Sequence, residues 1–332
     1  MMKFLLNTCL IIVAFFAASP AYSQKDAPLK LNFKEGNSYH VKVTEVLYLK
    51  QQAPQVDADM VEPATRTSIY NFTETIEKLN PDGTALVAST LDSFTTKIIV
   101  GKIDDRNEFF RFNSNNEYDL QNRLKDIRAL PRAQFLGQTL RYTLGADGLI
   151  KNFQNLSGFQ LATVARSFEY DMLNAMLSLS DSLRIGQLLE EGFGAIAAFA
   201  DGGKGKIQTP YTIAEIHVTR NLSVNRKGDQ LNYTGSFDAP PAKIDYLEGI
   251  AFPMKVENFK GGCYGSVIMH DGIAASGSAV DTANMDLHVD TEIYKSEIVR
   301  HLDFQREPIK VLRGATIQIK EIKSHTASPR PP

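Results

Sequence analysis

The stretch that decides the predicted fold is residues 159–200, which read FQLATVARSFEYDMLNAMLSLSDSLRIGQLLEEGFGAIAAFA. Apolar side chains recur there every three or four residues, as on one face of an α-helix. The positions are Leu161, Val164, Phe168, Met172, Ala175 and Leu179. Residues 180–182 (Ser-Asp-Ser) then offer a break and a new N-cap, so a second helix is expected from Leu183 to Glu191.

Strand-like sequence punctuated by turns lies on both sides of this segment. The chain therefore predicts an α+β fold, mostly antiparallel β, in which one or more curved sheets wrap a central helical segment. The expected divisions are a signal peptide (1–23), an N-terminal β-rich half (24–157), central helices with a Gly-rich loop (158–206), a C-terminal β-rich half (207–323) and a disordered tail (324–332).

Local signals place several turns and one bend. Three Asp-Gly pairs, at 82–83, 147–148 and 271–272, predict hairpins because this pair favours tight turns. Tyr39, Val41 and Val43 share one strand face, but the apolar residues that follow are Val46 and Tyr48. A phase shift of one residue predicts a β-bulge near Glu45.

The first 23 residues resemble a secretory signal. Lys3 precedes an apolar core from Phe4 to Ala18, and Ala21-Tyr22-Ser23 has the small residues that signal peptidase needs. Cleavage before Gln24 predicts an exported protein, in the periplasm, at the cell surface or outside the cell. No second segment is apolar and long enough to predict a membrane span after cleavage.

Charge and cysteine content narrow the classes of partner. Removing 23 of the 332 residues leaves 309 and, with the loss of Lys3, takes the formal net charge from −2 to −3. A near-neutral chain gives no electrostatic reason to expect a nucleic-acid partner. Cys263 alone remains after cleavage, so an internal disulfide is excluded and a buried, inert thiol is expected.

Two groups of polar residues are candidates for catalytic or metal sites. Alternation places Asp286, His288 and Asp290 on one strand face, where they could bind a metal, but the wet face of a half-buried strand looks the same and is favoured. Glu215 and His217 could form an acid–base pair, and a surface patch is again favoured. Catalytic residues are therefore not assigned, and no metal or cofactor is expected.

The apolar run 193–200 could be a mobile lid or an interfacial element, although ordinary helix core is favoured. A sheet folded round an apolar helical segment leaves a groove for an acyl chain or a partner helix. The residues expected to line this groove are Phe168, Met172, Leu188, Phe193, Ile196 and Phe199. The expected partner is an apolar small molecule or lipid.

The signal ending at Ser23-Gln24, and strands leading through Gly137-Gln138-Thr139 to residues 147–150, resemble Bacteroidetes-type exported β-rich proteins of unknown function. The order of strands, helices and strands is also similar to the lipoprotein-carrier fold, a curved antiparallel sheet holding helices in its concavity, which implies an apolar ligand groove. Neither resemblance supplies a catalytic motif. The leading hypothesis is a non-enzymatic exported binding protein. The alternatives are an envelope component that binds another protein and a hydrolase with an unrecognised site.

Overall fold

The computed structural model describes residues 31–57, 61–101, 107–122, 133, 135–154, 189–190, 204–213, 216–244 and 253–309. Of these residues 73% lie in strands and 4% in helices, and no described helix reaches seven residues. The predicted α+β class is therefore wrong, because the described chain is nearly all β. The predicted central segment 158–206 lies outside the described residues, except for Leu189 and Glu190 and for Lys204–Lys206, which begin a strand instead of ending a Gly-rich loop.

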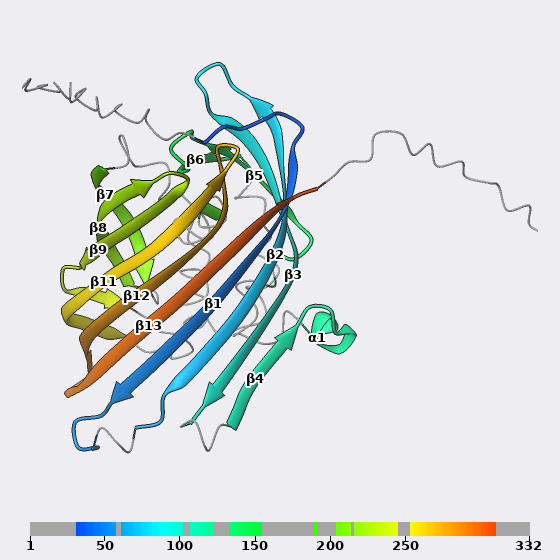
Figure 1. Cartoon of the computed structure of the whole chain (residues 1–332). Coiled ribbons are helices and arrows are strands. Elements are labelled where there is room, and N and C mark those ends of the chain that lie inside the picture. Colours follow the sequence, from blue (N-terminus) through cyan, green and yellow to red (C-terminus); the bar gives the residue numbers. More distant parts are fainter. Residues whose placement is uncertain are drawn as a thin grey trace, which may run out of the picture.

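One antiparallel sheet of 13 strands makes up the described fold (Figure 1). The strands are β1 (Ser38–Gln52), β2 (Ala64–Leu79), β3 (Ala85–Val100), β4 (Asn107–Asn113), β5 (Thr139–Leu144), β6 (Ile150–Phe153), β7 (Lys204–Ile213), β8 (Ile216–Lys227), β9 (Gln230–Asp238), β10 (Ala242–Ile244), β11 (Met254–His270), β12 (Ile273–Val289) and β13 (Glu292–Pro308). A short helix, α1 (Glu117–Gln121), follows β4, with Asn116 as its N-cap.

The strand order is β6-β5-β3-β2-β1-β13-β12-β11-β9-β8-β7, with β4 paired to β3 and β10 to β11. Both predicted β halves thus belong to one sheet, and each half is a meander in which strands close in sequence lie side by side. The halves meet where β1 pairs with β13, from Tyr39 opposite Pro308 to Gln52 opposite Lys295. The chain between β6 and β7 joins the two opposite edges of the sheet.

The predicted bulge near Glu45 is wrong. Strand β1 keeps an unbroken register with β2 and with β13. Val43, Glu45 and Leu47 all point to the same face and are all buried. The apparent phase shift arose because a charged residue occupies an interior position, so that the half-buried outer residues Val46 and Tyr48 were mistaken for the core.

The three Asp-Gly hairpins are confirmed. They join β2 to β3, β5 to β6 and β11 to β12, and Gly83, Gly148 and Gly272 have φ of 82°, 74° and 77°. These values are the left-handed conformation that glycine adopts without strain. A further hairpin between β12 and β13 was missed, because a single strand was expected across Asp290, which turns instead with φ of 53°.

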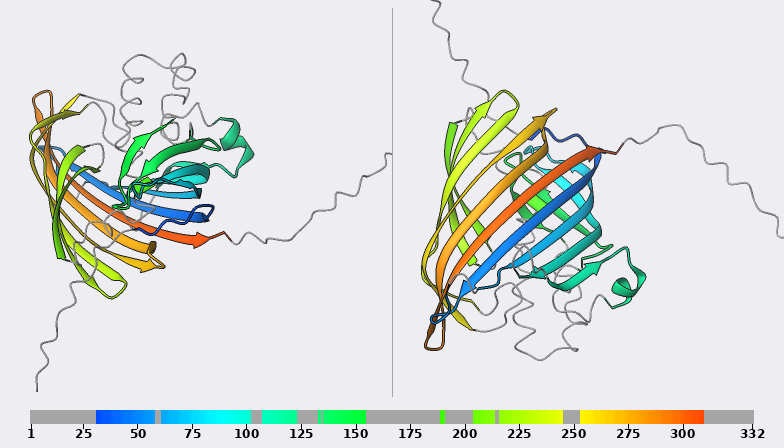
Figure 2. Two further views of the ribbon diagram at one scale, coloured as in Figure 1. Left: turned by 90° about the horizontal axis from the view of Figure 1, so that it is seen from above. Right: turned by 60° about the horizontal axis from the view of Figure 1, so that its bottom comes forward.

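The sheet is strongly curved, and one side-chain contact shows how tightly (Figure 2). Tyr211 on β7 donates a 2.6 Å hydrogen bond to Asp281 on β12, although β7 and β12 are four places apart in the strand order. At about 4.8 Å per strand, four steps along a flat sheet would separate these strands by about 19 Å. The sheet must therefore curl so that β7 approaches β12 across the concave face.

Candidate functional site

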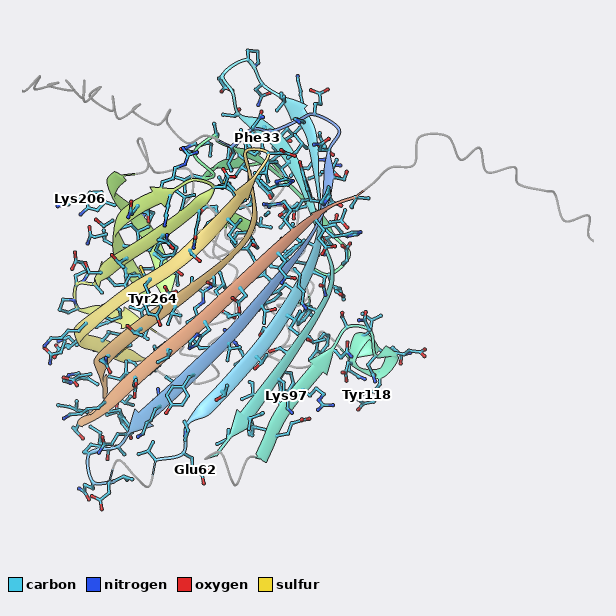
Figure 3. All side chains as sticks on the ribbon, in the orientation of Figure 1. Phe33, Glu62, Lys97, Tyr118, Lys206 and Tyr264 are labelled. Atoms are coloured by element: carbon cyan, nitrogen blue, oxygen red, sulfur yellow. The ribbon has the colours of Figure 1, made fainter. Side chains whose placement is uncertain are left out.

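The two faces of the curved sheet differ in chemistry. The concave face carries large buried side chains from both meanders, including Val43, Tyr70, Tyr233, Met285, Ile298 and Phe304. The convex face is mostly polar and wet, as at Lys42, His217, Thr234, Thr282, Asn284 and Asp303. Figure 3 shows the side chains of both faces and labels Tyr264, an exposed exception on β11. This alternation is that of a sheet with one apolar face and one solvated face.

Among the described residues, buried charged side chains interrupt the apolar face in two places, and we call the larger group the arginine belt. It comprises Arg66, Glu45, Arg300, Asp281, Tyr211 and Arg220, and each has a relative exposure of 9% or less. Buried charges are costly unless they are paired and hydrogen-bonded. The partners of each charged side chain in the belt therefore have to be identified.

Glu45 binds two arginines at once. Arg66 Nη2 lies 2.9 Å from Glu45 Oε2, and Arg300 Nε lies 2.9 Å from Glu45 Oε1. The register explains this bridge, because Arg66 and Arg300 both lie opposite Leu47, which is two residues along β1 from Glu45. Side chains on such diagonals of an antiparallel pair are within reach of each other when they are long.

Arg300 continues the belt toward the far edge of the sheet. Its Nη1 donates to the Tyr211 hydroxyl at 2.6 Å and approaches Asp281 Oδ2 at 3.3 Å. The Tyr211 hydroxyl in turn donates to the same Asp281 oxygen at 2.6 Å. Asp281 thus accepts hydrogen bonds from Tyr211 and Arg300. These side-chain hydrogen bonds connect β7 to β12 and β13.

Arg220 on β8 is the last member of the belt, and it contacts the ring of Tyr211. Its guanidinium carbon lies 4.2 Å from the centre of the Tyr211 ring, a cation–π geometry, and Nε donates to Thr209 Oγ1 at a long 3.3 Å. The Tyr211 ring also stacks on Phe237, with centroids 5.5 Å apart. Within the described residues, no carboxylate lies at ion-pair distance from Arg220, although only 8% of the residue is exposed.

Cys263 lies directly opposite Asp281 in the sheet and is buried and free, as the sequence predicted. Burial and, to a smaller extent, the nearby Asp281 charge raise the pKa of this thiol to about 12, and Arg220 partly opposes the rise. A thiol so protonated is a poor nucleophile. Cys263 is thus a packing residue of the belt.

Glycines let aromatic rings lie flat on the concave face. Phe237 pairs with Gly261, Tyr233 with Gly265, and Phe304 with Gly277 across neighbouring strands. A Cβ on Gly261 would come within 2.9 Å of the Phe237 ring and 2.7 Å of the Thr282 carbonyl oxygen. The absence of a side chain is what allows each ring to cover its partner strand.

A second buried pair lies apart from the belt. Arg306 Nη2 donates to Glu74 Oε2 at 2.9 Å, and the side chains of both are 1% exposed. Burial raises the pKa of Glu74, and Arg306 opposes that rise. Burial also raises the pKa of neighbouring Tyr142 well above its usual value, with Glu74 adding to the effect. The pair anchors β2 to β13 through the interior.

The six residues predicted to line a ligand groove, Phe168, Met172, Leu188, Phe193, Ile196 and Phe199, lie outside the described residues. Their neighbour Leu189 is described, and it belongs to the same buried cluster as the concave face. Glu190 accepts a 2.8 Å hydrogen bond from the backbone nitrogen of Ile150 on the edge strand β6.

The structure keeps Asp286 and His288 on one face of β12 and removes Asp290 from that face. Asp286 accepts a hydrogen bond from Asn258 at 2.7 Å, and His288 lies 3.0 Å from Glu257. Asp290 is in the β12–β13 turn instead of on the strand face where it was expected. In the part of the chain that the structure describes, no group of three or more His, Cys, Asp or Glu residues could hold a metal ion.

The other pair weighed for catalysis is only half described. His217 is exposed on the convex face of β8, and its Nδ1 lies 3.1 Å from Thr212 Oγ1. Glu215 lies outside the described residues. His217 is therefore exposed, as expected for the surface patch that the sequence favoured.

A cleft of about 530 Å³ opens near the ends of β1 and β11–β13. Its charged lining residues are Lys50, Lys260, Lys295, Asp286 and Glu297. Both signs of charge are present in the lining of this cleft.

Sequence reasoning missed every member of the belt. The usable signal was strict alternation: Tyr39, Val41, Val43, Glu45 and Leu47 occupy every second position of β1, so Glu45 had to share their face if the strand was regular.

No protein-family model and no curated protein sequence matches the chain. Among solved structures, the chain is similar to Pseudomonas aeruginosa OccK7 (OpdD), with 7% identity and a TM-score of 0.23 over 83% of this chain and 100% of that one. It is also similar to P. aeruginosa OccK5 (OpdH), with 6% identity and a TM-score of 0.20 over 82% and 99%. TM-scores this low do not indicate a shared fold. Among the described residues, no helix has the length and apolar character needed to cross a bilayer.

Proposed function

We propose that this chain is a non-enzymatic exported protein that binds an apolar ligand, a lipid or another acyl-chain compound, against the concave face of its sheet. The observation that carries the proposal is the asymmetry of the two faces. Large apolar side chains from both meanders line the concave face, and polar side chains cover the convex one. Ligand sites for apolar molecules are concave and mostly apolar, with a few placed polar groups.

The proposed cellular location outside the cytoplasm rests on the signal-like sequence of residues 1–23. Lipids exposed to water need a protein that covers their acyl chains, because about 0.8 kcal/mol is gained for each buried CH₂ group. A curved sheet with an apolar inner face meets that need.

Lipid extraction followed by mass spectrometry tests the proposal on the chain from Gln24 onward. We expect acyl lipids to be recovered in stoichiometric amounts, and the neutral probe N-phenylnaphthylamine to fluoresce when it is added to delipidated protein. A ligand-free protein that also ignores the probe would overturn the proposal.

A further inference from the structure

Counted over the described residues, the belt holds more positive than negative charge. Three arginines, Arg66, Arg300 and Arg220, face two carboxylates, Glu45 and Asp281, within the described residues. Glu45 is engaged by two of the arginines, and Asp281 by Arg300 and Tyr211. One buried guanidinium, that of Arg220, is thus left over.

Among the described residues, Arg220 contacts the Tyr211 ring and the Thr209 hydroxyl. Tyr211 lies against one side of Arg220, and Phe237 and Thr209 are its direct partners on the two neighbouring strands. A buried cation without an anion costs free energy, and it binds a matching anion more strongly than a cation in water would. The guanidinium fork also fits a carboxylate with two parallel hydrogen bonds.

We propose that the concave face takes a single-chain amphiphile ending in a carboxylate, a fatty acid, with Arg220 binding the carboxylate and the apolar wall covering the chain. The inference rests on the proposed function and names its ligand class. Charge complementarity selects this occupant, since Arg220 supplies one unmatched positive charge and the wall around it is apolar.

The glycines of β9 and β11 suit this arrangement. Gly235 and Gly261 lie on the concave face between Arg220 and Asp281, and Phe237 covers Gly261. Tyr211 is held in place by its bonds to Asp281 and Arg300, so it fixes one side of the Arg220 guanidinium. The belt therefore positions the cation before a ligand arrives, which reduces the entropy lost on binding.

The test is displacement of bound N-phenylnaphthylamine by three amphiphiles with the same chain and different headgroups, at about pH 8, where a carboxylic acid is ionised. Lauric acid, methyl laurate and dodecyltrimethylammonium are the competitors. We expect lauric acid to compete at least about 30-fold better than the other two, the effect of one buried charge pair. This comparison uses the unaltered chain and so does not depend on any variant folding.

Variants then assign the effect to Arg220. Arg220→Met is expected to abolish the preference for lauric acid over methyl laurate while leaving probe binding in place, and Arg220→Lys to restore part of it. Arg111→Met is the matched control, because Arg111 is exposed on β4 and paired with Glu108. It should leave the preference unchanged.

The outcomes separate the two proposals. Equal competition by all three amphiphiles, or a preference that survives Arg220→Met, overturns the role of Arg220 and leaves apolar binding intact. Failure of the unaltered protein to bind the probe or any amphiphile overturns both.

Discussion

At the scale of single residues, the belt shows how burial sets chemistry. With its pKa raised to about 12, the Cys263 thiol is almost wholly protonated at neutral pH. Because this pKa lies above the ordinary value of 9.0, the thiol's contribution to stability is complete below about pH 9 and is lost as the pH rises toward 12.

The chain from Gln24 onward should therefore resist thiol reagents. At about pH 8 only about one native Cys263 in ten thousand is ionised, against roughly a tenth of thiols with the ordinary pKa of 9.0. Reaction with Ellman's reagent is expected to be at least a thousandfold slower in the folded protein than in guanidinium chloride. Comparable rates in the two conditions would show that Cys263 is accessible.

The sequence predicted Cys263 correctly and Glu45 wrongly, for one reason. A cysteine behaves as a small apolar residue, so the burial of Cys263 agrees with the apolar alternation of its strand. A glutamate at an interior position contradicts the pattern, and its partners Arg66 and Arg300 lie 21 and 255 residues away. No local signal reports such distant pairing.

At the scale of elements, glycines on the concave face are expected to tolerate no side chain. A Cβ on Gly265 would collide with the Tyr233 hydroxyl and the Ser278 carbonyl oxygen. Gly265→Ala should lower the free energy of unfolding by about 1–3 kcal/mol, the cost of overpacking.

Chemical denaturation measures this difference, and Ser266→Ala, on the outer face of the same strand, is the control. Surface substitutions of that kind are usually within about 0.5 kcal/mol of neutral. If Gly265→Ala is as stable as the control, Tyr233 does not pack closely against Gly265 on β11.

Strands were predictable where their signals were local. The Asp-Gly pairs placed three hairpins because the turn chemistry is contained in two residues. Strand β13 lies within the predicted C-terminal β-rich half, but its alternation was not recognised because Arg300 and Arg306 occupy interior positions. The helical pattern in residues 159–200 suggested an α+β fold, whereas the described chain is nearly all β.

At the scale of the molecule, curvature creates the candidate site. Tyr211, Arg300 and Asp281 meet only because β7 curls back toward β12 and β13. Such long-range closure depends on the twist and curvature of the sheet from β7 to β13, which sequence patterns do not encode. A curved sheet was expected, but the belt inside it was not.

The central claim is that an acyl chain lies against the concave face, and single tryptophans test it directly. The chain has no natural tryptophan, so each introduced one reports alone. Phe237→Trp places the reporter beside Arg220 and Tyr211, and Tyr264→Trp places it on the convex face, where Tyr264 is 56% exposed.

The decisive measurement is quenching of these two tryptophans by a brominated fatty acid, after circular dichroism has shown that both variants fold. The account predicts saturable, near-complete quenching of the tryptophan at position 237 and little quenching at position 264. Equal quenching at the two positions, or stronger quenching at position 264, would contradict it.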